Sequence, residues 1–105
     1  MICAVFHFGE NGISFTVKGH SGRAKAGEDI LCAAVSSAVY MAANTVSEIL
    51  GLSPEIAERD GFLSLALTSS AEAKAASPVI EGLCLHLAGL EEQYPDYIHV
   101  ERGAL

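Results

Sequence analysis

The sequence predicts an α/β protein of the α+β type, a two-layer sandwich in which two helices cover one face of a mostly antiparallel sheet. Two observations carry this prediction. Pairs of segments with alternating apolar residues surround Asn-Gly and Asp-Gly dipeptides, and two longer segments carry apolar residues three and four positions apart. The predicted order is ββαββαβ, in a single domain spanning residues 1–105.

A hairpin is predicted at the start of the chain. Residues 2–8 alternate between apolar and other side chains, as a half-buried strand does. Asn11-Gly12 follows, and both residues tolerate the positive φ of a tight hairpin turn. Residues 13–18 alternate again, so this second strand delivers the chain to His20.

A long helix is predicted over residues 29–50. Gly51 suits the position just after its end, and Pro54 prevents its continuation. Its apolar residues recur at steps of three and four and form one stripe. The stripe consists of Leu31, Val35, Ala38, Ala42, Val46 and Ile49.

The second half of the chain repeats the pattern. Residues 55–67 predict a hairpin with an Asp60-Gly61 turn. Residues 69–77 suit either a loop or a first helical turn, and Pro78 at the first helical position predicts a helix capped by Ser77. The apolar stripe of this helix consists of Ile80, Leu83, Leu87, Leu90 and Tyr94. Pro95 ends it, and residues 97–100 predict a short last strand.

Composition narrows the function classes. The formal net charge is −7 with only six scattered Lys and Arg, which argues against nucleic acid as a main partner and favours a basic one. No apolar run approaches the roughly 18 residues that span a bilayer, so no membrane partner is expected. Half of the residues are apolar, a surplus that predicts a homo-oligomer interface.

Cysteine usage and the first residues predict a cytoplasmic protein. Three cysteines without a Cys-x-x-Cys pair argue against a disulfide framework and for a reducing compartment. Residues 1–7 lack the basic leader and small-residue cleavage site of a signal peptide.

The chemistry centres on residues 19–36. If Asp29 caps the long helix, Cys32 falls near the third helical position, where unpaired N–H groups and the helix dipole favour a thiolate. Cys32 is then a candidate nucleophile, and the same N–H groups could stabilise an oxyanion. The alternative is a small buried core residue, the commonest setting of a free cysteine.

His20 is the candidate base. It stands at the end of a strand, and the loop that follows it can fold back and bring the imidazole over the helix start, where it would take the thiol proton and return it to a leaving amine. The alternative is an exposed loop histidine without a role.

Two further side chains have two possible roles each. Asp29 either caps the helix, the favoured role, or orients His20 as a third catalytic residue. Ser36 lies one turn after Cys32 and either contacts the sulfur or substrate, or bonds back to the helix backbone.

The loop itself is predicted to be a lid. Gly19, Gly22 and Gly27, with Ser21 among them, permit a segment that opens and closes over the thiol. A phosphate-binding loop using Arg23 and Lys25 is the alternative, but the Walker pattern is absent and the acidic pair at 28–29 would repel a phosphate.

Neither a metal nor a cofactor is expected. The other three histidines, at 7, 86 and 99, show no metal-ligand spacing.

These residues resemble a known signature. Gly19-His20, Gly27 and the run DILCAAVS at 29–36 are similar to the motif of the bacterial ribosomal-processing cysteine protease family Prp, and the resemblance extends to YPDYI at 94–98. It implies a homodimeric Cys-His protease with an α/β sandwich fold. The family removes an N-terminal extension from a large-subunit ribosomal protein, after an aromatic pair. The resemblance assigns Cys32 as nucleophile and His20 as general base, with supporting roles for Asp29 and Ser36.

Three functions compete at this point. The first is the protease, with a ribosomal protein precursor as its peptide substrate. The second is a non-enzymatic module that binds a ribosomal protein or the ribosome through the glycine loop. The third, a redox-sensing thiol, lacks a resolving cysteine, since Cys3 and Cys84 are expected to be core or sheet residues.

Overall fold

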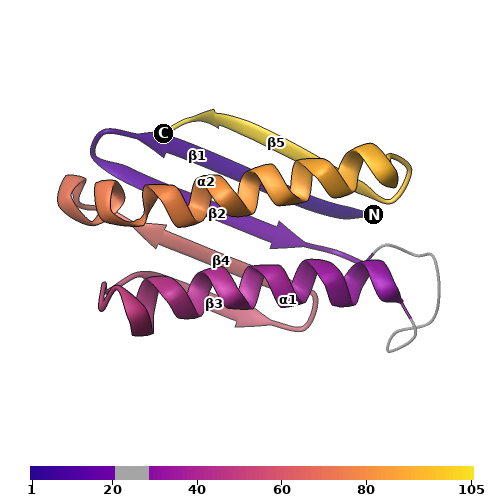
Figure 1. Ribbon diagram of the computed structural model, residues 1–105, viewed down its shortest axis with the longest axis horizontal. Coiled ribbons are helices and arrows are strands. Elements are labelled where there is room, and N and C mark those ends of the chain that lie inside the picture. Colours follow the sequence, from indigo (N-terminus) through magenta and orange to yellow (C-terminus); the bar gives the residue numbers. More distant parts are fainter. Residues whose placement is uncertain (21–28) are drawn as a thin grey trace.

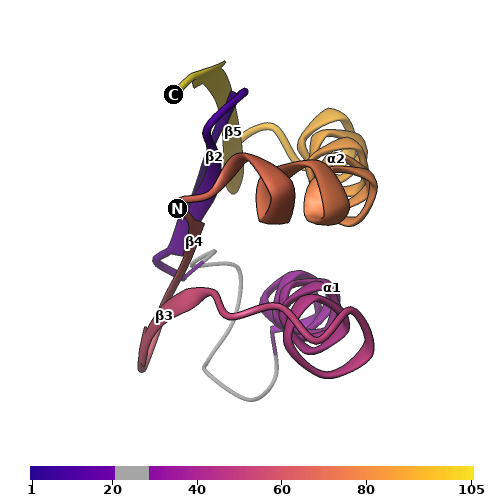
Figure 2. The ribbon, with the colours of Figure 1, turned by 90° about the vertical axis from the view of Figure 1, so that its left-hand side faces the viewer.

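A five-stranded sheet forms one layer of the protein and two helices form the other (Figure 1). Figure 2 shows both helices on the same face of the sheet. The computed structural model describes residues 1–20 and 29–105. In chain order the elements are β1 (Ile2–Gly9), β2 (Gly12–Lys18), α1 (Ile30–Asn44), the π-helical turn η1 (Thr45–Ile49), β3 (Glu55–Arg59), β4 (Phe62–Leu67), α2 (Ser70–Gln93) and β5 (Ile98–Ala104).

The sheet is mixed, with the order β3-β4-β2-β1-β5. Three neighbouring pairs are antiparallel, and β1 with β5 is parallel. The predicted ββαββαβ order and the two-layer, mostly antiparallel architecture are therefore confirmed. β3 and β5 are the edge strands of this sheet. Figure 2 shows α1 over the side formed by β3 and β4, and α2 over the side formed by β1 and β5.

The core lies between the two layers, as the alternation predicted. Phe6 of β1 and Phe15 of β2 are fully buried, with ring centroids 5.6 Å apart. Leucines 63, 65 and 67 of β4 are buried on the same face. The helices contribute the buried residues Leu31, Val35, Val39, Ala42, Ala43, Val46, Ala73, Ala76, Ile80, Leu83, Cys84 and Leu87.

The first helical segment has the predicted extent but a different ending. Its last turn is π-helical, with the Leu50 N–H donating to the Thr45 carbonyl at 2.8 Å. Gly51 follows with φ of 67°, the left-handed conformation expected just after a helix. The wider turn rotates Ile49 off the apolar stripe, so the prediction that Ile49 packs in the core is wrong: it is 78 % exposed.

The segment Ile30–Ile49 corrects the prediction that no apolar run approaches the length that spans a bilayer. It has 20 residues and a mean hydropathy of 1.5, so by length and composition alone it could cross a membrane. Core helices pass the same test, and Leu31, Val35 and Ala42 of this segment are buried against the core.

The predicted start of the second helix is wrong. α2 begins eight residues earlier, where the Ser69 Oγ accepts a hydrogen bond from the Glu72 N–H at 3.1 Å, and Pro78 lies inside the helix. Proline removes one backbone hydrogen bond, the one to the carbonyl of Lys74. Both residues are exposed, so water can take the place of the missing donor.

The last strand is longer than predicted. β5 runs to Ala104 because it pairs with β1 along its whole length, from Ile2 with Ile98 to Phe8 with Ala104. The pattern at 97–100 revealed only its buried start, because most of the later residues are exposed.

Candidate active site

An open cavity of about 730 Å³ separates the first half of α1 from the β3–β4 hairpin. On the helix side, Cys32, Ser36 and Tyr40 line it at successive turns. On the sheet side, it is lined by Val17, Leu63 and the Asp60-Gly61 turn. The cavity is thus walled by elements that are far apart in sequence.

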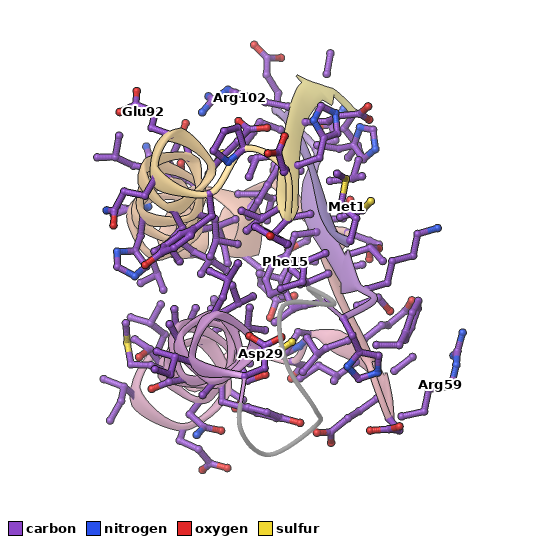
Figure 3. All side chains as sticks on the ribbon, turned by 90° about the vertical axis from the view of Figure 1, so that its right-hand side faces the viewer. Met1, Phe15, Asp29, Arg59, Glu92 and Arg102 are labelled. Atoms are coloured by element: carbon purple, nitrogen blue, oxygen red, sulfur yellow. The ribbon has the colours of Figure 1, made fainter. Side chains whose placement is uncertain are left out.

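Asp29 caps α1, as predicted. Its side chain accepts a hydrogen bond from the Cys32 N–H at 3.1 Å, and its carbonyl accepts from the Ala33 N–H at 3.1 Å. Asp29 is 7 % exposed, and Figure 3 shows it at the start of α1, between the helix and the sheet. A buried carboxylate at a helix N-terminus is stabilised by the helix dipole.

Cys32 occupies the third position of α1, which the sequence also predicted. Its residue is half-buried, packed against the edge of the core, and it lines the cavity. The alternative of a fully buried core cysteine is therefore excluded. The Cys32 N–H donates to the Asp29 side chain, so the predicted oxyanion role requires other N–H groups of the first helical turn.

The turn after β2 fixes the place where His20 leaves the sheet. The Gly19 N–H donates to the Gly61 carbonyl at 2.8 Å, and Gly19 has φ of 96°. A Cβ on Gly19 would lie 2.3 Å from the Met1 carbonyl oxygen, so glycine is required here. Gly19, which the sequence placed in the lid, is held by the sheet.

His20 lies against the β3–β4 turn and lines the same cavity as Cys32. A Cβ built on Gly61 would lie 2.8 Å from the His20 Nε2 and 3.3 Å from its Cε1, so the ring rests on the bare glycine. The structure therefore brings His20 from the end of β2 and Cys32 from the start of α1 to one cavity. An imidazole and a thiol that share a cavity have the components of nucleophilic catalysis.

Other predicted site residues divide into two groups. Ser36 is exposed on α1 and lines the cavity one turn after Cys32. The rest of the predicted lid, Ser21, Gly22 and Gly27, and the alternative phosphate ligands Arg23 and Lys25, lie outside the described residues. Within residues 1–20 and 29–105, no three His, Cys, Asp or Glu side chains gather as metal ligands.

Sequence reasoning missed the far end of the cavity. The Tyr40 hydroxyl on α1 donates a hydrogen bond to the Glu58 carboxylate on β3, across the cavity. This bond, together with burial and the nearby negative charge, raises the pKa of Tyr40, so the phenol is a donor at neutral pH. The spacing of Tyr40 from Cys32 and Ser36 could have identified it, but Glu58 depends on the position of an edge strand.

Comparisons with known proteins identify the family to which the chain is similar. Residues 1–99 match the family model described as cysteine protease Prp. The chain is 32 % identical over 93 residues to the ribosomal processing cysteine protease Prp of Bacillus subtilis, covering 84 % of this chain and 83 % of that protein.

Solved structures share the fold. A crystal structure of the ribosomal processing protease Prp from S. aureus with a covalently linked product peptide superposes with a TM-score of 0.80 and 24 % identity, over 97 % of this chain and 99 % of that one. SMU.848 from Streptococcus mutans superposes with a TM-score of 0.77 and 24 % identity, over 100 % and 96 %. The chain is therefore a cysteine protease and belongs to the Prp family of ribosomal processing proteases.

Proposed function

We propose that this protein is a cysteine endopeptidase in which Cys32 and His20 form the catalytic dyad, and that it removes the N-terminal extension of a large-subunit ribosomal protein. The observation that carries the proposal is the meeting of Cys32 and His20 in one cavity, with Cys32 in the first turn of α1. The Prp structures of S. aureus, which hold a substrate peptide and a covalently linked product peptide, support a peptide substrate.

The chemistry follows from these positions. His20 accepts the thiol proton, and the thiolate of Cys32 attacks the scissile carbonyl to give a tetrahedral oxyanion. N–H groups of the first turn of α1 and the helix dipole stabilise that charge. The carbon–nitrogen bond then breaks, His20 protonates the departing amine, and water hydrolyses the thioester with His20 as base.

Asp29 and Ser36 support this reaction. Asp29 fixes the start of α1, and with it the position of Cys32, through the hydrogen bond to the Cys32 N–H. Ser36 presents a hydroxyl to the cavity one turn further along α1, where it can hold the substrate backbone. The reaction requires no metal or cofactor.

The cavity suits an apolar peptide segment. Val17, Val35, Val39 and Leu63 line it, and these walls accept the aromatic pair that the family resemblance implies before the cleavage site. The formal net charge of −7 favours a basic ribosomal protein over nucleic acid as the partner.

The protein acts, in this proposal, as a cytoplasmic homodimer without a membrane partner. Ile30, Met41 and Ile49 are 78 %, 62 % and 78 % exposed along α1 and η1. A second copy that covers these side chains would remove a large apolar area from water. Sedimentation equilibrium should give twice the chain mass of 11.0 kDa, and a monomer at working concentration would contradict the assignment.

One experiment tests the activity directly. The purified protein is incubated with the unprocessed ribosomal protein precursor, and the product masses are read by mass spectrometry. We expect a single cut after the aromatic pair. A precursor that is bound but left intact would instead favour the non-enzymatic binding module.

Substituting Gly61 with alanine is expected to impair catalysis through His20. Its new Cβ would meet the His20 ring at 2.8 Å and displace it, and a misplaced base lowers kcat/KM by about 10-fold to 100-fold. Peptide cleavage kinetics measure the effect.

Gly51→Ala is the matched control for this substitution. Gly51 has the same φ of 67° as Gly61, but a Cβ there meets nothing within 4 Å. Both variants should lose about 1 kcal/mol of unfolding free energy to backbone strain, whereas only Gly61→Ala should lose activity. Equal activity in the two variants would contradict the position of His20 in the mechanism.

A further inference from the structure

Tyr40 and Glu58 close the cavity at the end away from Gly19. Tyr40 is the eighth residue after Cys32 on α1, and its hydroxyl donates to the Glu58 carboxylate on the edge strand β3. Both side chains line the cavity and both remain exposed, so the carboxylate keeps lone pairs that a ligand can reach.

The strand register explains why Glu58 faces the cavity. Directly opposed residues of an antiparallel pair share a face of the sheet. Glu58 is opposite Leu63, Leu63 is opposite Val17, and Val17 is opposite Ala4. The other three members of this row are buried beneath the helices. Glu58 therefore ends an apolar row with a negative charge, on the face that α1 covers.

The two residues that follow Glu58 bring one positive and one negative charge to the edge of the cavity. Arg59 belongs by register to the opposite face, where its guanidinium lies 3.8 Å from the centre of the Phe62 ring, although the residue still borders the cavity. Figure 3 shows Arg59 at the outer edge of the sheet, directed away from the helices. Asp60, the next residue, lines the cavity and adds a second negative charge.

The distance along α1 between Cys32 and Tyr40 corresponds to a definite number of residues of an extended peptide. Eight residues of helix span about 12 Å, because each residue rises about 1.5 Å. An extended peptide advances about 3.3 Å per residue, so a peptide that lies along α1 reaches the Tyr40–Glu58 pair about three or four residues from the scissile bond.

We propose that Glu58 selects a substrate with a lysine or arginine three or four residues from the scissile bond, and that Tyr40 positions the Glu58 carboxylate for this contact. The inference rests on the proposed function, since it takes Cys32 as the site of cleavage. It adds a charge requirement to the apolar requirement of the cavity walls.

Peptide kinetics test the charge contact. Peptides that carry the cleavage sequence are made with lysine or glutamine at the third and fourth positions on either side of the scissile bond. At one of these positions, the wild-type enzyme should cleave the lysine peptide with a kcat/KM about threefold to fivefold higher, the size expected for an exposed ion pair. In Glu58→Gln this preference for the lysine peptide over the glutamine peptide should disappear.

Glu55→Gln is the matched control. Glu55 is an exposed glutamate on the same strand, but it is opposite Ala66 and belongs to the other face of the sheet. This variant loses the same charge and should keep the lysine preference. Tyr40→Phe should weaken the preference through a higher KM for the lysine peptide, with kcat unchanged.

The outcomes separate this inference from the proposed function. If the wild type cleaves both peptides equally, or if Glu58→Gln and Glu55→Gln reduce the preference equally, the charge contact is overturned while the protease assignment stands. If the wild type cleaves no peptide, the proposed function itself fails.

Discussion

Replacing Cys32 with alanine is expected to lower kcat/KM for precursor cleavage by about 10⁴-fold or more, because no other group in the mechanism can attack the carbonyl. Cys32→Ser should be nearly as inactive, since a serine hydroxyl gives up its proton far less readily than a thiol. Cys32 is half-buried at the edge of the core, so either variant should change the free energy of unfolding by only about 1 kcal/mol. Single-turnover cleavage and chemical denaturation measure the two quantities.

The other cysteines provide the control. Cys3 is half-buried on β1, and Cys3→Ala should cleave the precursor at the wild-type rate. Burial raises the pKa of the Cys84 thiol, so this residue should react slowly with iodoacetamide at neutral pH. When the wild-type enzyme is treated with iodoacetamide, we therefore expect the loss of cleavage activity to follow alkylation of Cys32. Wild-type turnover by Cys32→Ala would leave the binding module as the better explanation.

The fold could be predicted from the sequence because local signals agreed with each other. Asp60-Gly61 forms the turn between β3 and β4, as predicted. The first hairpin is also present, but it turns one residue earlier than predicted, at Glu10-Asn11, because Gly12 pairs with Gly9 and begins β2. Hairpins can be predicted from the sequence where the turn residues and the alternation of the strands agree. Strand order was out of reach, since the pairing of β2 with β4 joins segments that no local pattern connects.

The two wrong predictions, the start of α2 and the burial of Ile49, arose where tertiary packing overrides a local sequence preference. Pro78 is typical of a helix start, yet the cap at Ser69 and the buried positions of Ala73 and Ala76 extend the helix through it. The apolar period predicted a core position for Ile49, but the π-helical turn η1 shifts that residue outward. In both cases the local sequence indicates which conformation a residue favours, and the packing of the whole fold determines which conformation it adopts.

Part of the site could be predicted from the sequence because it depends on residues that are close together in the chain. The cap by Asp29 and the position of Cys32 depend on neighbouring residues of one helix, and both appear as predicted. The support of His20 by Gly61 and the contact of Tyr40 with Glu58 depend on which strands lie side by side. Spacing along the chain holds no information of that kind.

His20→Ala is the substitution with the second-largest expected effect. Loss of a positioned acid–base group lowers kcat by about 10²-fold to 10⁴-fold, with little change in KM, because His20 acts on protons rather than on substrate binding. Alkylation of Cys32 by iodoacetamide should slow in the same variant, since the thiol loses its proton acceptor. Stopped-flow alkylation and steady-state cleavage, both followed across pH, measure these effects.

The control for a general histidine effect is His86→Ala, on the exposed side of α2 and outside the cavity. This variant should match the wild type in both assays. Added imidazole should restore part of the activity of His20→Ala, because the missing ring leaves space beside Gly61 for a small base, whereas it should do nothing for Cys32→Ala. If His20→Ala keeps kcat within about threefold of the wild type, proton transfer must come from another group, and the dyad proposed here is wrong even though Cys32 remains the nucleophile.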